Sequence, residues 1–230
     1  SLKEIHPFFN LFYYISFRAG LSLVLSFSFV LIFMPFWINI QSKLFPEGQP
    51  IRDDGPQSHL SKQGTPTFGG VLIIFSIIIN TIFWTSEFSN FNYMFLLTLI
   101  LFGLIGFYDD YQKVNFSKGI STKRKFFLQF LITIFIYFII KSNGYDLNNF
   151  YIPFFKNISV ELGIFYFFVI LFIIIGSTNA TNLTDGLDGL VSMPLIFVFL
   201  TFAIFAYILG KINFSNYLLV NYIPGSGEIV

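Results

Sequence analysis

Long stretches without a charged residue are the feature that most constrains this chain. They cover residues 19–42, 63–86, 88–108, 126–140, 162–176 and 190–210. About 20 apolar residues in a helix span the hydrocarbon of a bilayer. Only 11% of the 230 residues are charged, against about 25% in soluble domains. The sequence therefore predicts an all-α, polytopic transmembrane helical bundle, with six spans in a single integral membrane domain over residues 1–230.

The run 126–140 is the shortest of the six. Its fifteen residues between Lys125 and Lys141 would reach roughly 22 Å as a helix, so we expect those lysines to snorkel or the bilayer to thin. The absence of cysteine excludes a disulfide framework and a cysteine metal site. A net charge of +1 gives no support for a nucleic-acid partner.

The positions of the basic residues predict the orientation of the spans. The loops after the first and third runs carry eight lysines and arginines, and the rest of the chain carries five. Cytoplasmic loops are enriched in these residues. We therefore expect the loops after the first, third and fifth runs to be cytoplasmic. Three polar segments, 52–67, 109–125 and 179–188, would then converge on that face. On the other face, residues 142–161 are expected to hold a short hairpin.

Residues 175–190, IGSTNATNLTDGLDGL, place two aspartates and two asparagines between two apolar runs without a lysine or arginine. Carboxylates at the ends of membrane spans are costly unless they serve a site. The alternative is a polar turn, for which Asn, Asp, Thr and Gly are ordinary residues. The sequence therefore leaves a functional loop and a plain turn open at this point.

Asp109 and Asp110 follow the third run directly, and five basic residues come within the next fifteen positions. An acidic pair at a helix C-terminus opposes the helix dipole, although a helix-stopping pair at the interface is the structural alternative. Clustered carboxylates suit a divalent cation or a general base, and clustered lysines suit phosphate. Both together favour phosphoryl transfer.

The segment 52–70, RDDGPQSHLSKQGTPTFGG, precedes the second run. Thr65 or Thr67 would cap the following helix, and Lys62 beside a helix N-terminus would form an anion site. The alternative is an ordinary basic juxtamembrane loop.

These residues resemble a known family. The segments RDDGPQSHLSKQGTPTFGG, GLIGFYDDYQKV, PFFKN and GSTNATNLTDGLDGL are similar, in this order, to the phospho-N-acetylmuramoyl-pentapeptide transferases. These belong to the polyprenyl-phosphate hexosamine-1-phosphate transferase superfamily. The resemblance implies about ten transmembrane helices and a magnesium-dependent reaction in the bacterial inner membrane. The reaction moves phospho-MurNAc-pentapeptide from UDP to undecaprenyl phosphate and gives lipid I and UMP.

The resemblance also implies roles for individual residues. Asp109 resembles the proposed base, Asp110 is the candidate metal ligand, and both match the catalytic pair, with Asp185 as a third catalytic candidate. Asp188 and Lys62 resemble the residues that contact uracil. The full set of candidate substrate-binding residues is Lys62, Thr67, Lys113, Lys125, Asn179, Asn182, Asp185 and Asp188.

The chain departs from the family at its C-terminal end. The resemblance implies a later Phe-Met-Gly-Asp segment and a His-rich loop, so the main metal ligand of the family is expected beyond Val230. We therefore expect an N-terminal piece of the transferase, without its C-terminal spans, that inserts in a membrane but is inactive alone.

Two other functions stay open: a sister transferase using UDP-N-acetylglucosamine, and a secondary transporter. Transporter carboxylates lie near the midplane, whereas these lie at segment ends. Beyond the lipid bilayer and the two substrates, the sequence leaves open a homodimer.

Overall fold

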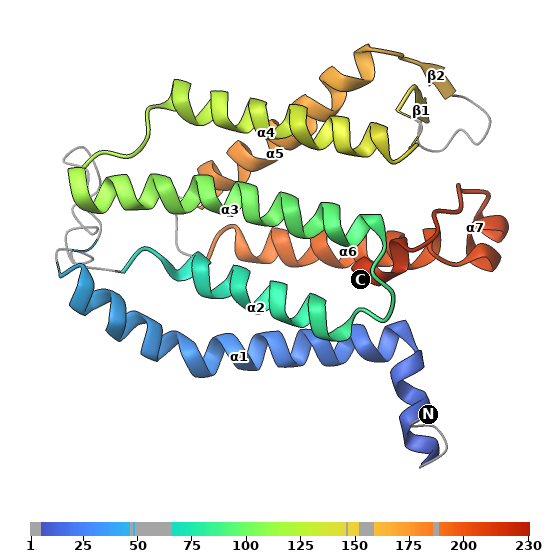
Figure 1. The fold of residues 1–230 in the computed structure, drawn as a ribbon, viewed down its shortest axis with the longest axis horizontal. Helices are drawn as coiled ribbons and strands as arrows, with labels where there is room; N and C mark the ends of the chain where they lie inside the picture. Colours follow the sequence, from blue (N-terminus) through green and yellow to red (C-terminus); the bar gives the residue numbers. More distant parts are fainter. Residues whose placement is uncertain (1–5, 47, 49–65, 146, 152–158, 186–188) are drawn as a thin grey trace. The chain divides into compact units, whose positions relative to one another are not determined.

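The computed structural model describes residues 6–46, 48, 66–145, 147–151, 159–185 and 189–230, and it is almost entirely helical (Figure 1). The larger helices are α1 (Ile15–Leu44), α2 (Gly69–Trp84), α3 (Asn90–Phe116), α4 (Thr122–Ser142), α5 (Phe165–Thr184) and α6 (Ser192–Leu209). Shorter elements are η2 (Pro7–Tyr13), α7 (Ile212–Leu218) and η4 (Ser226–Ile229). The predicted all-α, polytopic helical class is confirmed.

Five of these helices, α1, α3, α4, α5 and α6, are long and apolar enough to cross a membrane. The second predicted span, 63–86, appears as the 16-residue helix α2, which begins at Gly69. Thr67 stands two residues before α2, not at the cap position, and Thr65 lies outside the described residues. The fourth span is longer than its uncharged run, because α4 has 21 residues and includes both Lys125 and Lys141. The helix is about 31 Å long, but its apolar run between the two lysines is unchanged, so the expected snorkelling or thinning stays a prediction.

The predicted hairpin is confirmed. Strands β1 (Asn149–Tyr151) and β2 (Ser159–Glu161) pair antiparallel, with Phe150 opposite Val160. The hairpin lies between α4 and α5 in the sequence.

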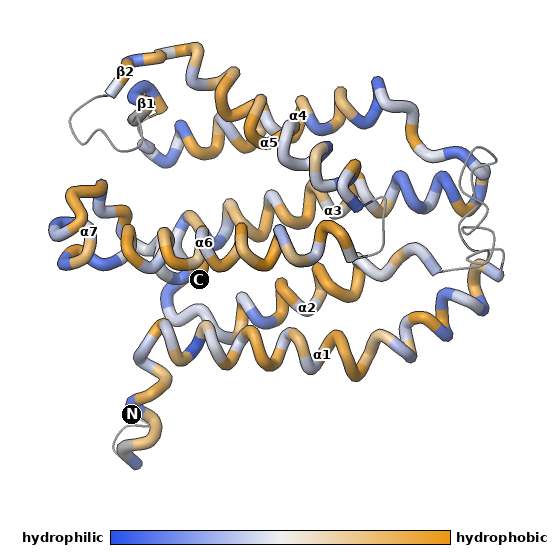
Figure 2. Tube along the Cα trace, turned by 180° about the vertical axis from the view of Figure 1, so that it is seen from behind, coloured by the Kyte–Doolittle hydropathy of each residue, from blue (hydrophilic) through white to orange (hydrophobic). Residues whose placement is uncertain are grey.

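Among the described residues, many large apolar side chains are exposed, and buried polar residues outnumber buried apolar ones. Figure 2 shows hydrophobic residues along every long helix, and α6 has no buried residue. The largest fully buried side chains are all polar: Gln129, Asn92, Thr133, Ser76 and Ser215. Lipid is as apolar as leucine, so helices in a membrane associate through close packing and hydrogen bonds. The prediction of an integral membrane protein agrees with this distribution.

The chain divides into two compact units, each described by itself. Unit 2 comprises Phe17–Trp84 and Leu96–Leu128, and unit 1 comprises the remainder. The helices α3 and α4 each contribute residues to both units. The single-domain organisation stays a prediction.

Unit 2 is held together by contacts among α1, α2 and α3. Ser76 on α2 donates to the carbonyl of Ser26 on α1 at 3.2 Å. Arg18, at the start of α1, donates from Nη1 to the carbonyl of Trp84 at 2.7 Å, which satisfies an acceptor at the last residue of α2. A Cβ on Gly103 would lie 2.5 Å from Cδ1 of Ile74. A larger residue at position 103 would therefore require the end of the Ile74 side chain to shift.

Unit 1 holds the remaining helices. Phe167 on α5 packs edge-on against Tyr137 of α4, with ring centroids 5.1 Å apart. Near the end of α6, a Cβ on Gly210 would lie 2.5 Å from the backbone nitrogen of Gly227. The segment around η4 is thus packed directly on α6, where Ser226 donates to the carbonyl of Ala206 at 3.1 Å.

Candidate functional site

The acidic pair lies within α3 and not after its end. The prediction that the helix stops at the first charge was wrong, because α3 continues from Asp109 to Phe116. Lys113 explains the continuation. It lies three and four residues after the two aspartates, the spacings at which side chains meet on a helix. Its Nζ is 2.9 Å from Oδ2 of Asp109 and 3.0 Å from Oδ1 of Asp110.

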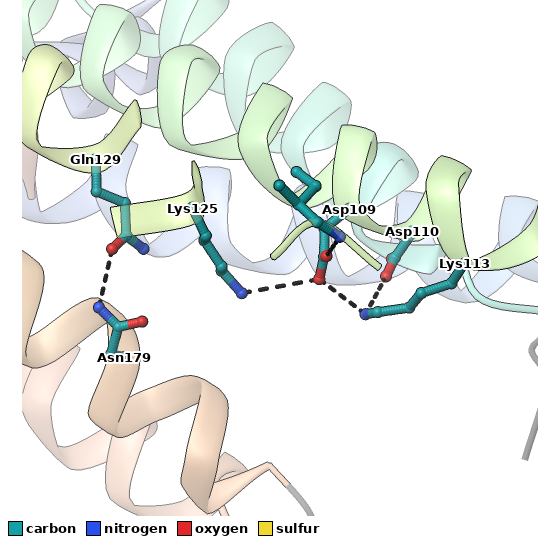
Figure 3. Close-up of polar contacts among 7 residues, drawn as sticks. Asp109, Asp110, Lys113, Lys125, Gln129 and Asn179 are labelled. Carbon is teal, nitrogen blue, oxygen red and sulfur yellow. Dashed lines mark hydrogen bonds and ion pairs between the residues drawn. The ribbon is translucent and has the colours of Figure 1, made fainter. Parts of the chain in front are cut away.

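Asp109 is the more enclosed of the two aspartates, and its oxygens are both occupied. Its side chain is 12% exposed, against 27% for Asp110. Oδ2 faces Lys113, and Lys125 on α4 approaches the same oxygen at 3.8 Å. Oδ1 accepts the backbone N–H of Ile120 at 2.9 Å. We call Asp109, Asp110, Lys113 and Lys125 the charged cluster (Figure 3).

The loop between α3 and α4 approaches the side chain of Asp109 closely. Ser117 takes a left-handed conformation with φ of 57°, which turns the chain back toward the helix. A Cβ on Gly119 would lie 2.6 Å from Oδ1 of Asp109. The glycine therefore lets the loop approach closely enough for Ile120 to donate. These loop residues were not predicted from the sequence, although a glycine shortly after an acidic helix end was an available signal.

Positive charge exceeds negative charge around the cluster. Lys118, Lys123 and Arg124 are exposed, and none of them forms an ion pair with another described residue. Two carboxylates therefore stand among five basic side chains. Lysines and arginines in the first turn of α4 oppose the helix dipole, so an anion bound there would be stabilised by both. This arrangement can hold a phosphate while keeping a carboxylate beside it.

The segment that was expected to be a loop, 177–184, is the last part of α5. The prediction that this span ends near Gly176 was wrong. Its hydroxyls explain the difference: Thr178, Thr181 and Thr184 each donate to the carbonyl four residues earlier at 2.7–2.9 Å. This pattern satisfies hydroxyls inside a helix, so a Thr-rich stretch need not be a turn.

The candidate residues of this segment follow a three-residue spacing. Asn179 and Asn182 are on α5, and Asp185 is its C-cap, whose N–H reaches the carbonyls of Thr181 and Leu183. Such spacing places the three residues near one side of the helix. Asn182 and Asp185 are exposed, whereas Asn179 is half-buried and donates to Gln129 of α4 at 2.9 Å. Gln129 was not recognised from the sequence.

The expected convergence of the polar segments stays a prediction, although aromatic residues that flank two of them are in contact. Phe68, next to Thr67, packs against Phe45 after α1 and Phe107 on α3, with ring centroids 5.2 and 5.3 Å apart. These three aromatic residues are therefore in contact within unit 2. They lie next to the end of α1, the start of α2 and the acidic pair of α3. Asn179, Asn182 and Asp185 belong to unit 1, and their convergence with the cluster stays a prediction. Lys62 and Asp188 lie outside the described residues.

The charged cluster fits a magnesium ion only as one part of its coordination. The described residues contain no group of three His, Cys, Asp or Glu side chains suited to a metal. Magnesium is commonly held by one or two carboxylates together with substrate phosphates and water. Asp110 suits such a role, because Lys113 contacts only its Oδ1.

The further metal ligand that the family resemblance implies is not among the described residues. It stays a prediction, and Asp110 is the candidate ligand among the described residues.

Comparison with known proteins identifies the family of this chain. Residues 92–223 match glycosyl transferase family 4. The chain is 44% identical over 226 residues to the phospho-N-acetylmuramoyl-pentapeptide-transferase of Rickettsia massiliae (strain Mtu5), and 42% identical to that of Rickettsia prowazekii (strain Madrid E). Each alignment covers 96% of this chain and 62% of the relative, so the chain spans less than two thirds of these proteins' length. The acidic pair, the cluster lysines and the Asn179–Asp185 segment all fall within the matched residues, and the chain belongs to glycosyl transferase family 4.

Proposed function

We propose that this chain is part of an enzyme that transfers phospho-MurNAc-pentapeptide from UDP-MurNAc-pentapeptide to undecaprenyl phosphate. The observation that carries the proposal is an acidic pair held by two lysines within an excess of positive charge. The names of the relatives supply the transferred phospho-N-acetylmuramoyl-pentapeptide group, and the family resemblance supplies the UDP donor and the undecaprenyl phosphate acceptor. The reaction brings two anionic phosphates together, which costs about 4 kcal/mol for unit charges 4 Å apart at an effective dielectric of 20. The cationic surroundings offset this repulsion.

In the proposed reaction, an oxygen of the lipid phosphate attacks the phosphorus that carries the sugar. The bond between that phosphorus and the bridging oxygen of UDP breaks, and UMP leaves with the electron pair. Asp109 accepts the proton of the lipid phosphate. Its Oδ2 is engaged by Lys113 at 2.9 Å, and an incoming phosphate competes for this ammonium, because both are anionic hydrogen-bond acceptors. Substrate binding thereby frees the base.

The remaining candidate residues have supporting roles in this proposal. Lys113 and Lys125 bind phosphate oxygens, and Asp110 would hold a magnesium ion, which offsets charge on the transferred phosphoryl group when bound. Asn179, Asn182 and Asp185 bind the nucleotide half together with Thr67, Lys62 and Asp188. Asp185 is a third candidate for the catalytic group.

A transfer assay separates this proposal from its rivals. The full-length protein that contains this chain, in reconstituted membranes, is supplied with undecaprenyl phosphate, magnesium and either UDP-MurNAc-pentapeptide or UDP-N-acetylglucosamine, and UMP release is measured. We expect release with the first donor only, and only when the lipid phosphate is present. Release with UDP-N-acetylglucosamine alone would assign the sister activity. Transmembrane flux of the donor without UMP release would indicate a transporter.

The proposal places the charged cluster at the cytoplasmic face of the bacterial inner membrane, where the nucleotide donor is found. Ser117 follows α3 beside the cluster, and Asn148 precedes the hairpin. From the positive-inside bias, we expect Ser117→Cys to react with an impermeant maleimide only after the cytoplasmic side is opened, and Asn148→Cys to react in intact spheroplasts. Labelling of both from one side would contradict this orientation.

A further inference from the structure

Gln129 is a buried amide in an otherwise apolar stretch of α4. Its side chain is among the largest fully buried ones, and the residue is 1% exposed. A polar group inside a membrane protein is costly unless it is hydrogen-bonded or functional. Gln129 has one side-chain partner among the described residues: its Oε1 accepts from Nδ2 of Asn179 on α5 at 2.9 Å (Figure 3).

The orientation of the Asn179 amide follows from its two neighbours. Nδ2 of Asn179 lies 2.8 Å from the carbonyl oxygen of Ile175 and 2.9 Å from Oε1 of Gln129. The Ile175 carbonyl is an acceptor whatever the side chains do, so the NH₂ group of Asn179 must face it. The second N–H of that group then points at Gln129, which must present its oxygen. The two amides therefore have only one consistent arrangement.

In this arrangement, one polar atom of each side chain has no hydrogen-bond partner among the described residues. Nε2 of Gln129 is buried without a hydrogen-bond partner, although buried polar groups are nearly always paired. Turning Gln129 around would set its NH₂ group against that of Asn179, so the unpaired N–H is a consequence of the contact. Asn179 is half-buried, and its Oδ1 makes no hydrogen bond with a described residue. Oδ1 of Asn179 is therefore an acceptor that takes no part in the contact between α4 and α5.

We propose that Gln129 is a positioning residue that fixes the Asn179 amide so that Oδ1 is available to a hydrogen-bond donor of the uridine nucleotide, a ribose hydroxyl or the imide N–H. The inference rests on the proposed function for the identity of the ligand. Without Gln129, the amide of Asn179 keeps only its bond to Ile175 and loses one of its two restraints. Nucleotide binding then weakens, while the phosphoryl transfer step is unchanged.

The test compares three variants of α4 in the active protein. Gln129→Met keeps the length of the side chain but removes the acceptor, and a lost neutral hydrogen bond predicts a rise of about five- to tenfold in KM for the UDP donor with kcat unchanged. Gln129→Glu presents an oxygen at the same place in either protonation state, and we expect it to restore the wild-type KM. Thr133→Val is the matched control, because Thr133 is equally buried but its hydroxyl bonds only to the backbone carbonyl of Gln129 at 2.8 Å. It should leave KM unchanged.

A double-mutant cycle shows whether Gln129 acts through Asn179. We expect Gln129→Met to add nothing to the KM defect of Asn179→Ala, since both remove the same contact. Additive defects, an unchanged KM in Gln129→Met, or an equal defect in Thr133→Val would each overturn the proposal. If Gln129→Met does not fold, Gln129→Glu decides the question, because a raised KM in that variant contradicts the acceptor role.

A measurement without substrate separates this inference from the proposed function. With ¹⁵N-asparagine labelling, the side-chain NH₂ signals of Asn179 are assigned by their loss in Asn179→Ala. We expect Gln129→Met to shift one of the two proton signals upfield, as it loses its hydrogen bond, and Thr133→Val to shift neither. Absence of UMP release in the wild type would refute the proposed function alone, whereas unshifted signals in Gln129→Met would refute the contact.

Discussion

Both ends of α3 carry polar side chains, but different interactions stabilise them at the two ends. Near its start, Ser86, Ser89, Asn92 and Glu228 form what we call the loop clamp. Asn92 is 0% exposed; its Oδ1 accepts from Ser89 N and Oγ, and its Nδ2 donates to the Glu228 carbonyl at 3.1 Å. The carboxylate of Glu228 accepts both the N–H and the hydroxyl of Ser86.

The other end of α3 carries the charged cluster, in which ion pairs between aspartates and lysines predominate. Asp110 has an oxygen that Lys113 does not contact, and three nearby basic residues have no ion pair among the described residues. A network of satisfied hydrogen bonds fixes structure, whereas an excess of one charge is suited to binding a ligand. We therefore expect the clamp to contribute to stability and the cluster to carry the proposed chemistry.

The largest expected effect is at Asp109. Asp109→Asn keeps the shape of the side chain and its contact with Ile120 but removes the proton acceptor. General base catalysis is typically worth about 10² to 10⁴ in rate. We expect kcat to fall by that range with the affinity for the UDP donor retained, as measured by UMP release and calorimetry. Near-normal turnover across the pH range would show that the acidic pair is structural.

The next effect concerns the nucleotide. Lys62→Ala and Asp188→Ala each remove one contact that the family resemblance assigns to uracil, and a lost buried polar contact costs about 1–3 kcal/mol. We expect calorimetry to show donor binding weakened by about five- to 150-fold, with little change in kcat. Lys43→Ala, the same change at an exposed lysine on α1, is the control. Unchanged affinity in both test variants would remove these residues from the nucleotide site.

The clamp is expected to affect stability and not turnover. Asn92→Ala leaves Ser89 and the Glu228 carbonyl without their partner, which predicts a loss of about 1–3 kcal/mol in the free energy of unfolding. Denaturant unfolding in detergent measures it. Asn115→Ala, whose side chain makes an exposed bond to Tyr111 on the same helix at 2.9 Å, should cost much less. An equal loss in both variants would mean that the clamp contributes no special stability.

The sequence predicted the helical class and the identity of the cluster better than the helix ends. Charges were taken as boundaries, yet Asp109 and Asp110 remain in α3 because Lys113 compensates both from within the same helix. Likewise, threonines that bond to their own helix allow α5 to continue to Thr184. Local charge or polarity therefore marks a helix end only when no partner lies three or four residues away.

Long-range contacts were beyond prediction from a single sequence. Gln129 is one amide in an apolar run, and its partner Asn179 is 50 residues away. Asn92 and Glu228 are separated by 136 residues. Neither pair leaves a periodic signal, because each depends on which helices pack together and not on the spacing within one helix.

Turnover of Asp109→Asn and Glu228→Gln, measured side by side and normalised to folded protein, tests the account most directly. Both variants replace a carboxylate by an amide of the same shape, one in the charged cluster and one in the loop clamp. We predict that Asp109→Asn lowers kcat at least about 100-fold, while Glu228→Gln stays close to the wild type because an amide oxygen still accepts from Ser86. Equal losses in the two variants, or a larger loss in Glu228→Gln, would contradict the assignment of chemistry to the charged cluster.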